Sequence, residues 1–341
     1  MPHTTAHCDG GAWPGSSSLA EQEHPRLQGE ASTPYDAASG AHLSLLRALW
    51  VSAGLGPADE FEPVSTRWLS IGFQGVPIEK RLVDKNASIL ICGGGSLDRQ
   101  TFINLGYSNV TVSNLDTRAS VDEFAPYKWD YQDAQSLSYD DDSFDYVVIH
   151  AAIHHASMPH KVLLEMYRVS KLGFLAFEAR DSFLMKIVTK LNLTQEYEHA
   201  AVFYNDCLYG GVNNTEIPNY VYRWTEREIE KTIQSFAPIC RHTFLYDYGS
   251  AYPCTPQLEL KNGLKVAILF LMKPFYLIFS KIFYKQQNQF AFFVLKASKE
   301  SALFPWLYKD KETNDIKFNR TWAQEKYRAE KDVEEHLSSN N

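Results

Sequence analysis

The sequence contains few cysteines, and none is spaced as a metal site or a disulfide framework requires. The five residues are Cys8, Cys92, Cys207, Cys240 and Cys254, and no two of them form a CxxC pair. Zinc sites and disulfide-rich scaffolds both show characteristic cysteine spacings. The sequence therefore predicts neither a metal centre nor a disulfide framework, and a reducing cytosol is the simplest compartment.

Two further absences limit where the protein acts and what it binds. The N-terminus lacks the basic start, apolar stretch and small-residue cleavage site of a secretory signal. Positive charge is not in excess either, because the formal net charge is -8 at pH 7. A surface that tracks phosphates usually makes a domain basic. We therefore expect a cytoplasmic protein that does not bind nucleic acid.

What is present is typical of a soluble globular protein, with 45% hydrophobic and 22% charged residues. A length of 341 residues suits one large α/β domain with extensions. Residues 1–40 are rich in Gly, Ser, Ala, Pro and His without an apolar period, which is typical of disorder. We predict a disordered segment at 1–40, a helical cap at 41–85, a core at 86–300 with an apolar insertion at 255–289, and a charged tail at 301–341.

Apolar runs and amphipathic stretches alternate through the core. They predict strands at 88–92, 110–115, 144–150, 173–178, 241–248 and 290–296, and helices at about 97–105, 159–170 and 225–236. Pro159 suits the first turn of its helix, and Thr225 with Glu228 forms a capping box. This alternation favours a doubly wound, Rossmann-like α/β sheet whose strands are mostly parallel.

A glycine turn at the end of the first strand carries the clearest functional signal. The apolar run 89–92 ends in Gly93, Gly94 and Gly95, where a Cβ would block the approach of a ligand. Asp116 follows the next strand, about twenty residues further on, where a carboxylate can accept hydrogen bonds from both hydroxyls of a ribose. The pattern indicates a nucleotide-like cofactor.

Further motifs follow in a fixed order. They are Asp133-Ala134-Gln135-Ser136-Leu137, Ser143-Phe144-Asp145, the stretch from His150 to His154 and His155, and Leu164-Glu165-Met166-Tyr167-Arg168-Val169. The series resembles the class I S-adenosylmethionine-dependent methyltransferases, and most of all the type 11 group that includes ubiquinone-pathway enzymes. The resemblance covers roughly residues 87 to 180. It implies a seven-stranded sheet with helices on both faces and an antiparallel last strand, and S-adenosylmethionine as cofactor.

The resemblance also assigns the binding residues. It implies a cofactor loop at Gly93, Gly94, Gly95 and Ser96, ribose binding by Asp116, adenine contacts at Asp133 and Ala134, and a methionine side lined by His150 and Ala151. The chain departs from the family at Ile91, where an acid is common, and at Leu97, where a further glycine is common. Asp98 lies close to both positions in the sequence, and whether its carboxylate takes the place of the missing acid is left open here.

A nicotinamide dinucleotide is the competing cofactor, and Asp98 separates the two. The third glycine of a dinucleotide turn allows the helix to pack closely while the pyrophosphate sits at its N-terminus. Asp98 occupies that position and is both bulky and negative. S-adenosylmethionine has no phosphate, so the acid favours the methyl donor.

Catalysis by this family is an in-line transfer of a methyl group, and a base is needed only for a weak nucleophile such as a hydroxyl. His154 and His155 follow a strand at the edge where ligands bind, so either is a candidate base, with His155 preferred. Alternatively, both residues only cap a helix and pack a loop. Residues 178–181 follow the fifth strand and are candidate contacts of the acceptor, Glu178 among them. Alternatively, Arg180 and Asp181 only pair with each other on a loop, which is the preferred expectation for Asp181.

Two segments outside the motifs are candidates for partner binding. Residues 203–224 combine six aromatic residues with Asn213 and Asn214, which suits an acceptor-binding lid or plain structural packing. Residues 264–284 are strongly apolar with Lys273 and Pro274 at their centre. They pack in the core or a dimer, or they lie on a membrane surface with lysines toward the headgroups. The oligomeric state is open.

Together these features predict a methyltransferase that acts on a small or glycan-like acceptor, at oxygen. Methylation of a quinone or another natural product is the nearest alternative. A non-catalytic scaffold with a degenerate methyltransferase fold is a third. Ile91 favours the scaffold, and the retained Asp116 and Asp133 oppose it.

Overall fold

The computed structural model describes residues 84–191, 194–249, 263–296 and 303–328, with the side chains of 263–270 and 277 excepted. The segments predicted as disordered at 1–40 and as a cap at 41–85 lie outside the described residues, apart from the last two positions of the cap. The limits of all the segments stay predictions.

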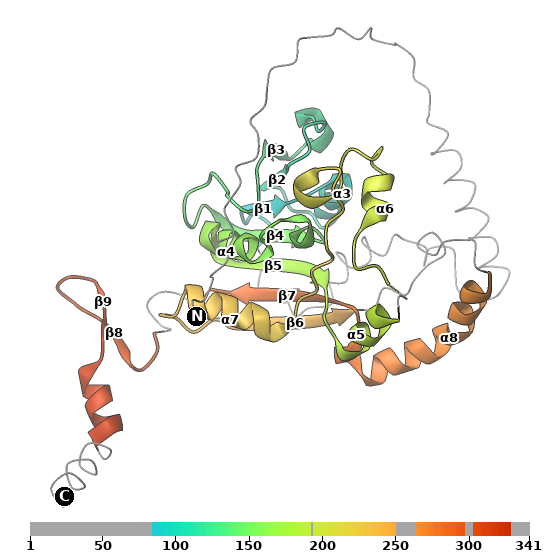
Figure 1. Cartoon of the computed structure of the whole chain (residues 1–341). Coiled ribbons are helices and arrows are strands. Elements are labelled where there is room, and N and C mark those ends of the chain that lie inside the picture. The colour runs from blue at the N-terminus through green and yellow to red at the C-terminus, as the bar shows by residue number, and fades with distance from the viewer. Residues whose placement is uncertain (1–83, 192–193, 250–262, 297–302, 329–341) are drawn as a thin grey trace, which may run out of the picture. The chain divides into compact units, whose positions relative to one another are not determined.

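A seven-stranded sheet forms the centre of the described region (Figure 1). Its strands, in spatial order, are β3 (Lys128–Tyr131), β2 (Val110–Asn114), β1 (Ile89–Cys92), β4 (Phe144–His150), β5 (Ser170–Ala179), β7 (Gln289–Leu295) and β6 (Thr243–Gly249). β7 is antiparallel to both of its neighbours, and the pairs from β3 to β5 are parallel. The predicted doubly wound sheet with an antiparallel last strand is confirmed.

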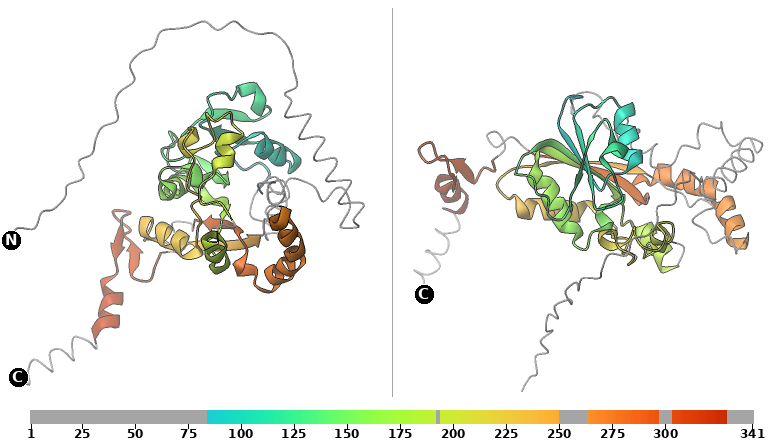
Figure 2. Two further views of the ribbon diagram at one scale, coloured as in Figure 1. Left: turned by 45° about the vertical axis from the view of Figure 1, so that its right-hand side comes forward. Right: turned by 90° about the horizontal axis from the view of Figure 1, so that it is seen from above.

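Helices cover both faces of this sheet. α3 (Ser96–Asn104) covers one face, and α4 (Pro159–Val169) and α7 (Glu226–Phe236) cover the other. The remaining described helices are α5 (Phe183–Lys190), α6 (His199–Phe203) and α8 (Gly263–Ile282), with short 3-10 turns at η3 (Val121–Phe124), η4 (Ile153–His155), η5 (Val212–Asn214) and η7 (Tyr284–Gln286). One apolar cluster joins Phe102 of α3 to Ile89 and Ile91, and a second joins α4 and α7 to Leu90 and Cys92. Alternate residues of β1 thus face opposite layers. The right-hand view of Figure 2 shows helices on both sides of the sheet.

The helix ends follow the sequence signals. Pro159 is the first residue of α4. In α7 the Thr225 hydroxyl accepts a hydrogen bond from the Glu228 amide at 3.2 Å, and the Glu228 carboxylate accepts one from the Thr225 amide at 3.0 Å. The capping box is therefore confirmed, and it fixes α7 against the same layer as α4.

Two features were not assigned from the sequence. Strand β3 is a short edge strand with no fully buried residue, so its polar sequence gave no apolar run. Within the expected charged tail, β8 (Leu307–Lys309) and β9 (Ile316–Phe318) pair as an antiparallel hairpin. The stacked rings of Phe304 and Trp306, 4.4 Å apart, lie just before it in the chain.

The apolar insertion forms the long helix α8, which includes Pro274. Its described outer residues remain exposed, among them Leu271, Phe275, Ile278 and Ile282. Across the part of the chain that the structure describes, no helix is both long and apolar enough to cross a bilayer.

Candidate functional site

The three glycines of the first turn differ in what they permit. Gly93 has φ +62°, and a Cβ there would lie 2.6 Å from the Ala152 Cβ. A Cβ at Gly94 would lie 2.7 Å from the Val112 Cγ1. At Gly95 an added Cβ would meet nothing within 4 Å. The first two glycines are thus required by the packing of the protein itself, and Gly95 leaves the open space that a ligand can enter.

Asp98, near the start of α3, stabilises the glycine loop. Its Oδ2 accepts a hydrogen bond from the Gly95 amide at 2.9 Å, and its Oδ1 lies 3.3 Å from the His150 Nδ1 without forming a hydrogen bond. Ile91, where the family commonly has an acid, is buried in the apolar core. A buried carboxylate therefore stands beside the glycine turn, although it comes from the helix rather than from β1.

Asp116 is the acid predicted for the ribose, and the structure gives it a partner that the sequence did not suggest. Arg118 donates to both carboxylate oxygens, at 2.9 and 2.7 Å, and its guanidinium lies 4.1 Å from the centre of the Tyr209 ring. The pair holds the pKa of Asp116 below its usual range. The carboxylate is charged and oriented, so it can accept hydroxyl donors at its remaining lone pairs.

Asp133 is joined to the predicted lid through Gln135. The Asp133 Oδ1 accepts hydrogen bonds from the amide and the side chain of Gln135, at 2.9 and 3.1 Å. The buried Gln135 also donates to Asn213 at 3.0 Å and accepts from the Ser157 hydroxyl at 2.8 Å. Asn214 donates to the Leu115 carbonyl at 3.1 Å. The two asparagines therefore fasten the 203–224 segment to the strand ends.

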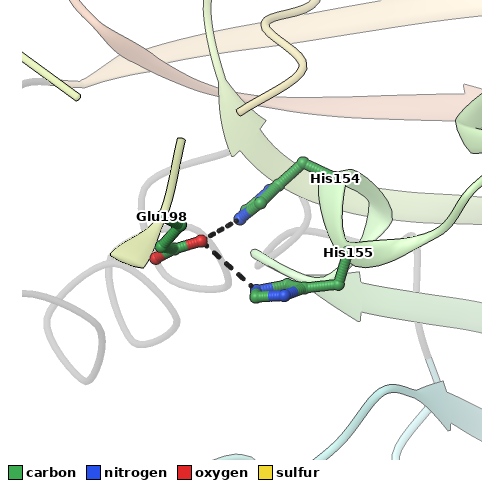
Figure 3. Close-up of side chains that lie close together, drawn as sticks. All are labelled: His154, His155 and Glu198. Atoms are coloured by element: carbon green, nitrogen blue, oxygen red, sulfur yellow. Dashed lines mark ion pairs between the residues drawn. The ribbon is translucent and has the colours of Figure 1, made fainter. Parts of the chain in front are cut away.

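His154 and His155 lie in η4, and both point toward Glu198 (Figure 3). The His154 Nδ1 is 2.6 Å from Glu178 Oε2, and its Nε2 is 3.2 Å from Glu198 Oε2. The His155 Nε2 lies 3.5 Å from the same Glu198 oxygen. The Asn219 side-chain amide donates to the His154 carbonyl and to Glu198, at 3.2 and 3.4 Å. These contacts form a partly buried polar cluster at the end of β5, in which His154 and Glu178 are buried and His155 and Glu198 are half-buried.

The charges of this cluster follow from its geometry. Burial lowers the pKa of His154, but Glu178 and Glu198 more than compensate and raise it to about 10. Burial raises the pKa of Glu198, but the two histidines outweigh this effect and lower the pKa to about 2. Burial and the neighbouring His154 lower the pKa of His155. In the metal-free protein His154 is therefore the cation of the cluster and His155 is neutral.

The charged residues at and just after the end of β5 make different contacts from those that the sequence predicted. Glu178 accepts the Ile153 amide at 2.8 Å and is buried against His154, so it orients the cluster rather than meeting an acceptor. Arg180 pairs with Glu226 at 2.8 Å, and Asp181 pairs with Lys186 at 3.4 Å. The expected pairing of Arg180 with Asp181 is wrong, because each finds a partner on a neighbouring helix.

The motif in α4 has a structural task. Glu165 accepts two hydrogen bonds from Arg168, at 2.9 and 2.8 Å, and one from the Leu137 amide at 2.9 Å. Arg168 also donates to the carbonyls of Leu137 and Tyr139. The Glu165–Arg168 pair thus anchors the loop that begins at Asp133 to helix α4.

The predicted cofactor residues gather at one edge of the sheet. They are Gly93, Gly94, Gly95 and Ser96 after β1, Asp116 after β2, Asp133 and Ala134 after β3, and His150 and Ala151 at the end of β4. The strand order reverses between β1 and β4, and the carboxyl ends at such a switch point form the ligand crevice of doubly wound folds. Fold and edge together define a class I methyltransferase domain.

The comparison with protein families agrees. Residues 92–177 match the model of the methyltransferase domain, a span that runs from the end of β1 into β5. Residues 92–177 thus form a methyltransferase domain of the type 11 group, whose methyl donor is S-adenosylmethionine. A search of the curated proteins gave no match.

Several solved structures are similar over most of their length. A chain from the Haloferax volcanii complex of the Trm112 methyltransferase activator and a methyltransferase is 14% identical, with 68% of this chain and 90% of that chain covered and a TM-score of 0.42. A Methanosarcina mazei S-adenosylmethionine-dependent methyltransferase is 16% identical (64% and 97% covered, TM-score 0.41). The Burkholderia thailandensis 1,6-didemethyltoxoflavin-N1-methyltransferase, with its substrate and S-adenosylhomocysteine bound, is 13% identical (80% and 94%, TM-score 0.39).

Proposed function

We propose that the protein methylates an oxygen atom of a small or glycan-like acceptor. The observation that carries the proposal is the placement of His155 beside the cofactor edge, in η4 directly after β4. An imidazole is suited to take the proton of a hydroxyl. The pKa of His154 is raised by its two carboxylates, so it is already protonated, whereas the pKa of His155 is lowered and its neutral imidazole is the base in this proposal.

The cofactor supplies a methyl group on a positively charged sulfur. Gly95 leaves room for it, Asp116 and Asp133 offer carboxylates to its ribose and adenine, and His150 and Ala151 border its methionine side. With the cofactor bound, it would supply the methyl group and retain the electron pair on its sulfur, and His155 would accept the proton that the acceptor hydroxyl loses. Most of the rate then comes from holding donor and acceptor in line.

The 203–224 segment is the proposed acceptor lid. Its asparagines hydrogen-bond to the strand-end loops, so they serve to hold the lid rather than to take acceptor hydroxyls. Phe203, Tyr204 and Tyr220 remain largely exposed. Exposed rings can stack on the faces of a sugar or an aromatic acceptor.

The proposal includes a cytoplasmic location and a peripheral contact of residues 264–284 with an anionic membrane. Phe275, Ile278 and Ile282 are each more than 60% exposed along one side of α8. Lys273 and Lys281 lie in the same helix, which has no acidic residue. Apolar side chains that enter the acyl boundary between lysines are typical of interfacial helices. Less co-sedimentation with anionic vesicles for a 264–284 deletion would support this contact, and no difference would exclude it.

The acceptor is tested by release of S-adenosylhomocysteine with methyl glycosides and with hydroquinone as probes. Turnover with a glycoside supports the glycan-like acceptor, and turnover with hydroquinone alone supports the quinone alternative. His155→Ala should lower kcat by at least about 100-fold, as for the loss of a general base. His199→Ala, an exposed neighbour of Glu198, is the matched control. Full activity of His155→Ala would remove the base assignment.

A further inference from the structure

The His154–His155–Glu198 cluster has the composition and the spacing of a metal site. Two imidazole nitrogens face one carboxylate oxygen, at 3.2 Å from His154 Nε2 and 3.5 Å from His155 Nε2 (Figure 3). The three ligand atoms lie within 4.8 Å of one another. Zinc–nitrogen and zinc–oxygen bonds of about 2.0–2.2 Å at tetrahedral angles separate neighbouring ligand atoms by about 3.3–3.6 Å. The two separations from Glu198 are close to this range, and the two histidine nitrogens lie no more than 4.8 Å apart.

The orientation of His154 is already that of a metal ligand. Its Nδ1 is held by Glu178 at 2.6 Å, and the side chain of Glu178 is fully buried. The other Glu178 oxygen accepts the Ile153 amide, so the carboxylate is fixed in place. A carboxylate that binds one nitrogen of an imidazole fixes the tautomer whose other nitrogen can bind a metal. The remaining nitrogen, Nε2, is the one that faces Glu198.

A proton on His154 accounts for only part of this arrangement. One imidazolium neutralises the contact between His154 and Glu198, but His155 approaches the same oxygen and its ring centre is 4.6 Å from that of His154. Beside them, the Asn219 Oδ1 is buried without a hydrogen-bond partner among the described residues. A buried polar atom of this kind often marks a place for a water molecule or an ion. One central cation would serve both imidazoles and the carboxylate at once.

We propose that His154, His155 and Glu198 bind a divalent transition-metal ion such as Zn²⁺, with Glu178 as the carboxylate that orients His154. Three protein ligands leave at least one position for water or another oxygen ligand, as in open zinc sites. Nitrogen and carboxylate donors select ions of the zinc class over Mg²⁺ or Ca²⁺, which prefer oxygen alone. None of these ligands is a cysteine, and Glu198 is far from the two adjacent histidines in the sequence. The cysteine spacing therefore gave no sign of this site.

The proposal predicts metal binding by the purified full chain, without cofactor or acceptor. Titration calorimetry with ZnCl2 on chelator-treated, desalted protein should give a site that His155→Ala and Glu198→Gln each weaken by at least about tenfold, as even the loss of an orienting partner does. His199→Ala and Glu196→Gln are matched controls, because both residues are exposed and adjoin Glu198. Their affinity should equal that of the wild type. Bound Co²⁺ should show the visible spectrum of a nitrogen- and oxygen-ligated ion in the wild type and the controls, and lose it in the two ligand variants.

Two results would overturn the metal site. One is the absence of Zn²⁺ binding by the wild type, and the other is wild-type affinity in both His155→Ala and Glu198→Gln, which would locate the ion elsewhere in the chain. The proposal is separable from the base role of His155. Because a bound ion uses the same side chain, saturating Zn²⁺ should inhibit methyl transfer and a chelator should restore it. Metal binding with unchanged turnover would leave the site standing and remove the base.

Discussion

The cofactor half and the acceptor half of the carboxyl edge are built in different ways. In the proposed cofactor half the two acidic residues are each held by a neighbour in sequence, as Arg118 holds Asp116 and Gln135 holds Asp133, both two residues away. In the acceptor half, His154 is held by Glu178 and Asn219, which are 24 and 65 residues away. The first half is a local motif repeated at successive strand ends, and the second exists only once the chain has folded.

Glu178→Ala should be the most damaging single change, because it acts on the half that depends on long-range contacts. It leaves the His154 imidazolium buried with one carboxylate fewer, and the loss of a partner from a buried pair costs about 3–5 kcal/mol. Urea denaturation measures the change in the free energy of unfolding. Glu196→Gln, at an exposed position, should change it by less than about 0.5 kcal/mol. A loss below about 1 kcal/mol for Glu178→Ala would show that the cluster does not stabilise this half.

Gly94→Ala and Gly95→Ala form a matched pair within the cofactor half. The first places a methyl group 2.7 Å from Val112 and should lower the free energy of unfolding by about 1–3 kcal/mol. The second meets no protein atom within 4 Å, so it should leave stability within about 0.5 kcal/mol and weaken binding of S-adenosylhomocysteine. Thermal unfolding and calorimetric titration measure the two effects. Equal stability of both variants would contradict the separate roles of the two glycines.

Glu165→Gln should weaken the link between α4 and the Asp133 loop in a pH-dependent way. Arg168 holds the pKa of Glu165 below its usual range. The stabilisation is therefore complete above the unfolded-state pKa and is lost as pH falls through the folded-state value. At neutral pH the variant should be less stable by about 1–2 kcal/mol, and the difference should shrink in acid. Urea denaturation across this range would contradict the account if the difference did not change with pH.

Arg118→Ala should have the smallest effect on stability. The Arg118 and Asp116 side chains are 42% and 29% exposed, and exposed pairs contribute about 0–1 kcal/mol. Asp116→Ala removes the acceptor for the ribose hydroxyls and should cost more in affinity for S-adenosylhomocysteine than Arg118→Ala does. Calorimetric titration of both variants measures this order. The reverse order would mean that Arg118 itself holds the ligand.

The sequence predicted the cofactor residues at the strand ends, and it predicted much less of the cluster around His154. Gly93, Asp116 and Asp133 stand directly after their strands, so strand assignment alone brings them to one edge. Strand β3 was not predicted, because an edge strand with no fully buried residue shows no apolar period. The sequence also gave no sign of the partner of Asn213, because its hydrogen bond with Gln135 joins residues 78 positions apart.

Glu198 and Asn219 illustrate why the acceptor half could not be predicted. Neither lies in a motif, and both are placed by the path of the chain after β5. A pairing such as Glu198 with Asn219, whose backbone atoms bond at 3.0 Å, leaves no periodic pattern. The weak signal that did exist was the composition of 203–224, which indicated a lid but not its hydrogen-bond partners.

The most direct test of the account is calorimetric titration of S-adenosylmethionine into the full chain, compared with Asp133→Ala. The account predicts saturable one-site binding by the wild type and clearly weaker binding by the variant, because Asp133 lies at the cofactor edge of the sheet. Absence of binding by folded wild-type protein would contradict it, and would make the chain a scaffold that keeps the methyltransferase fold without its cofactor.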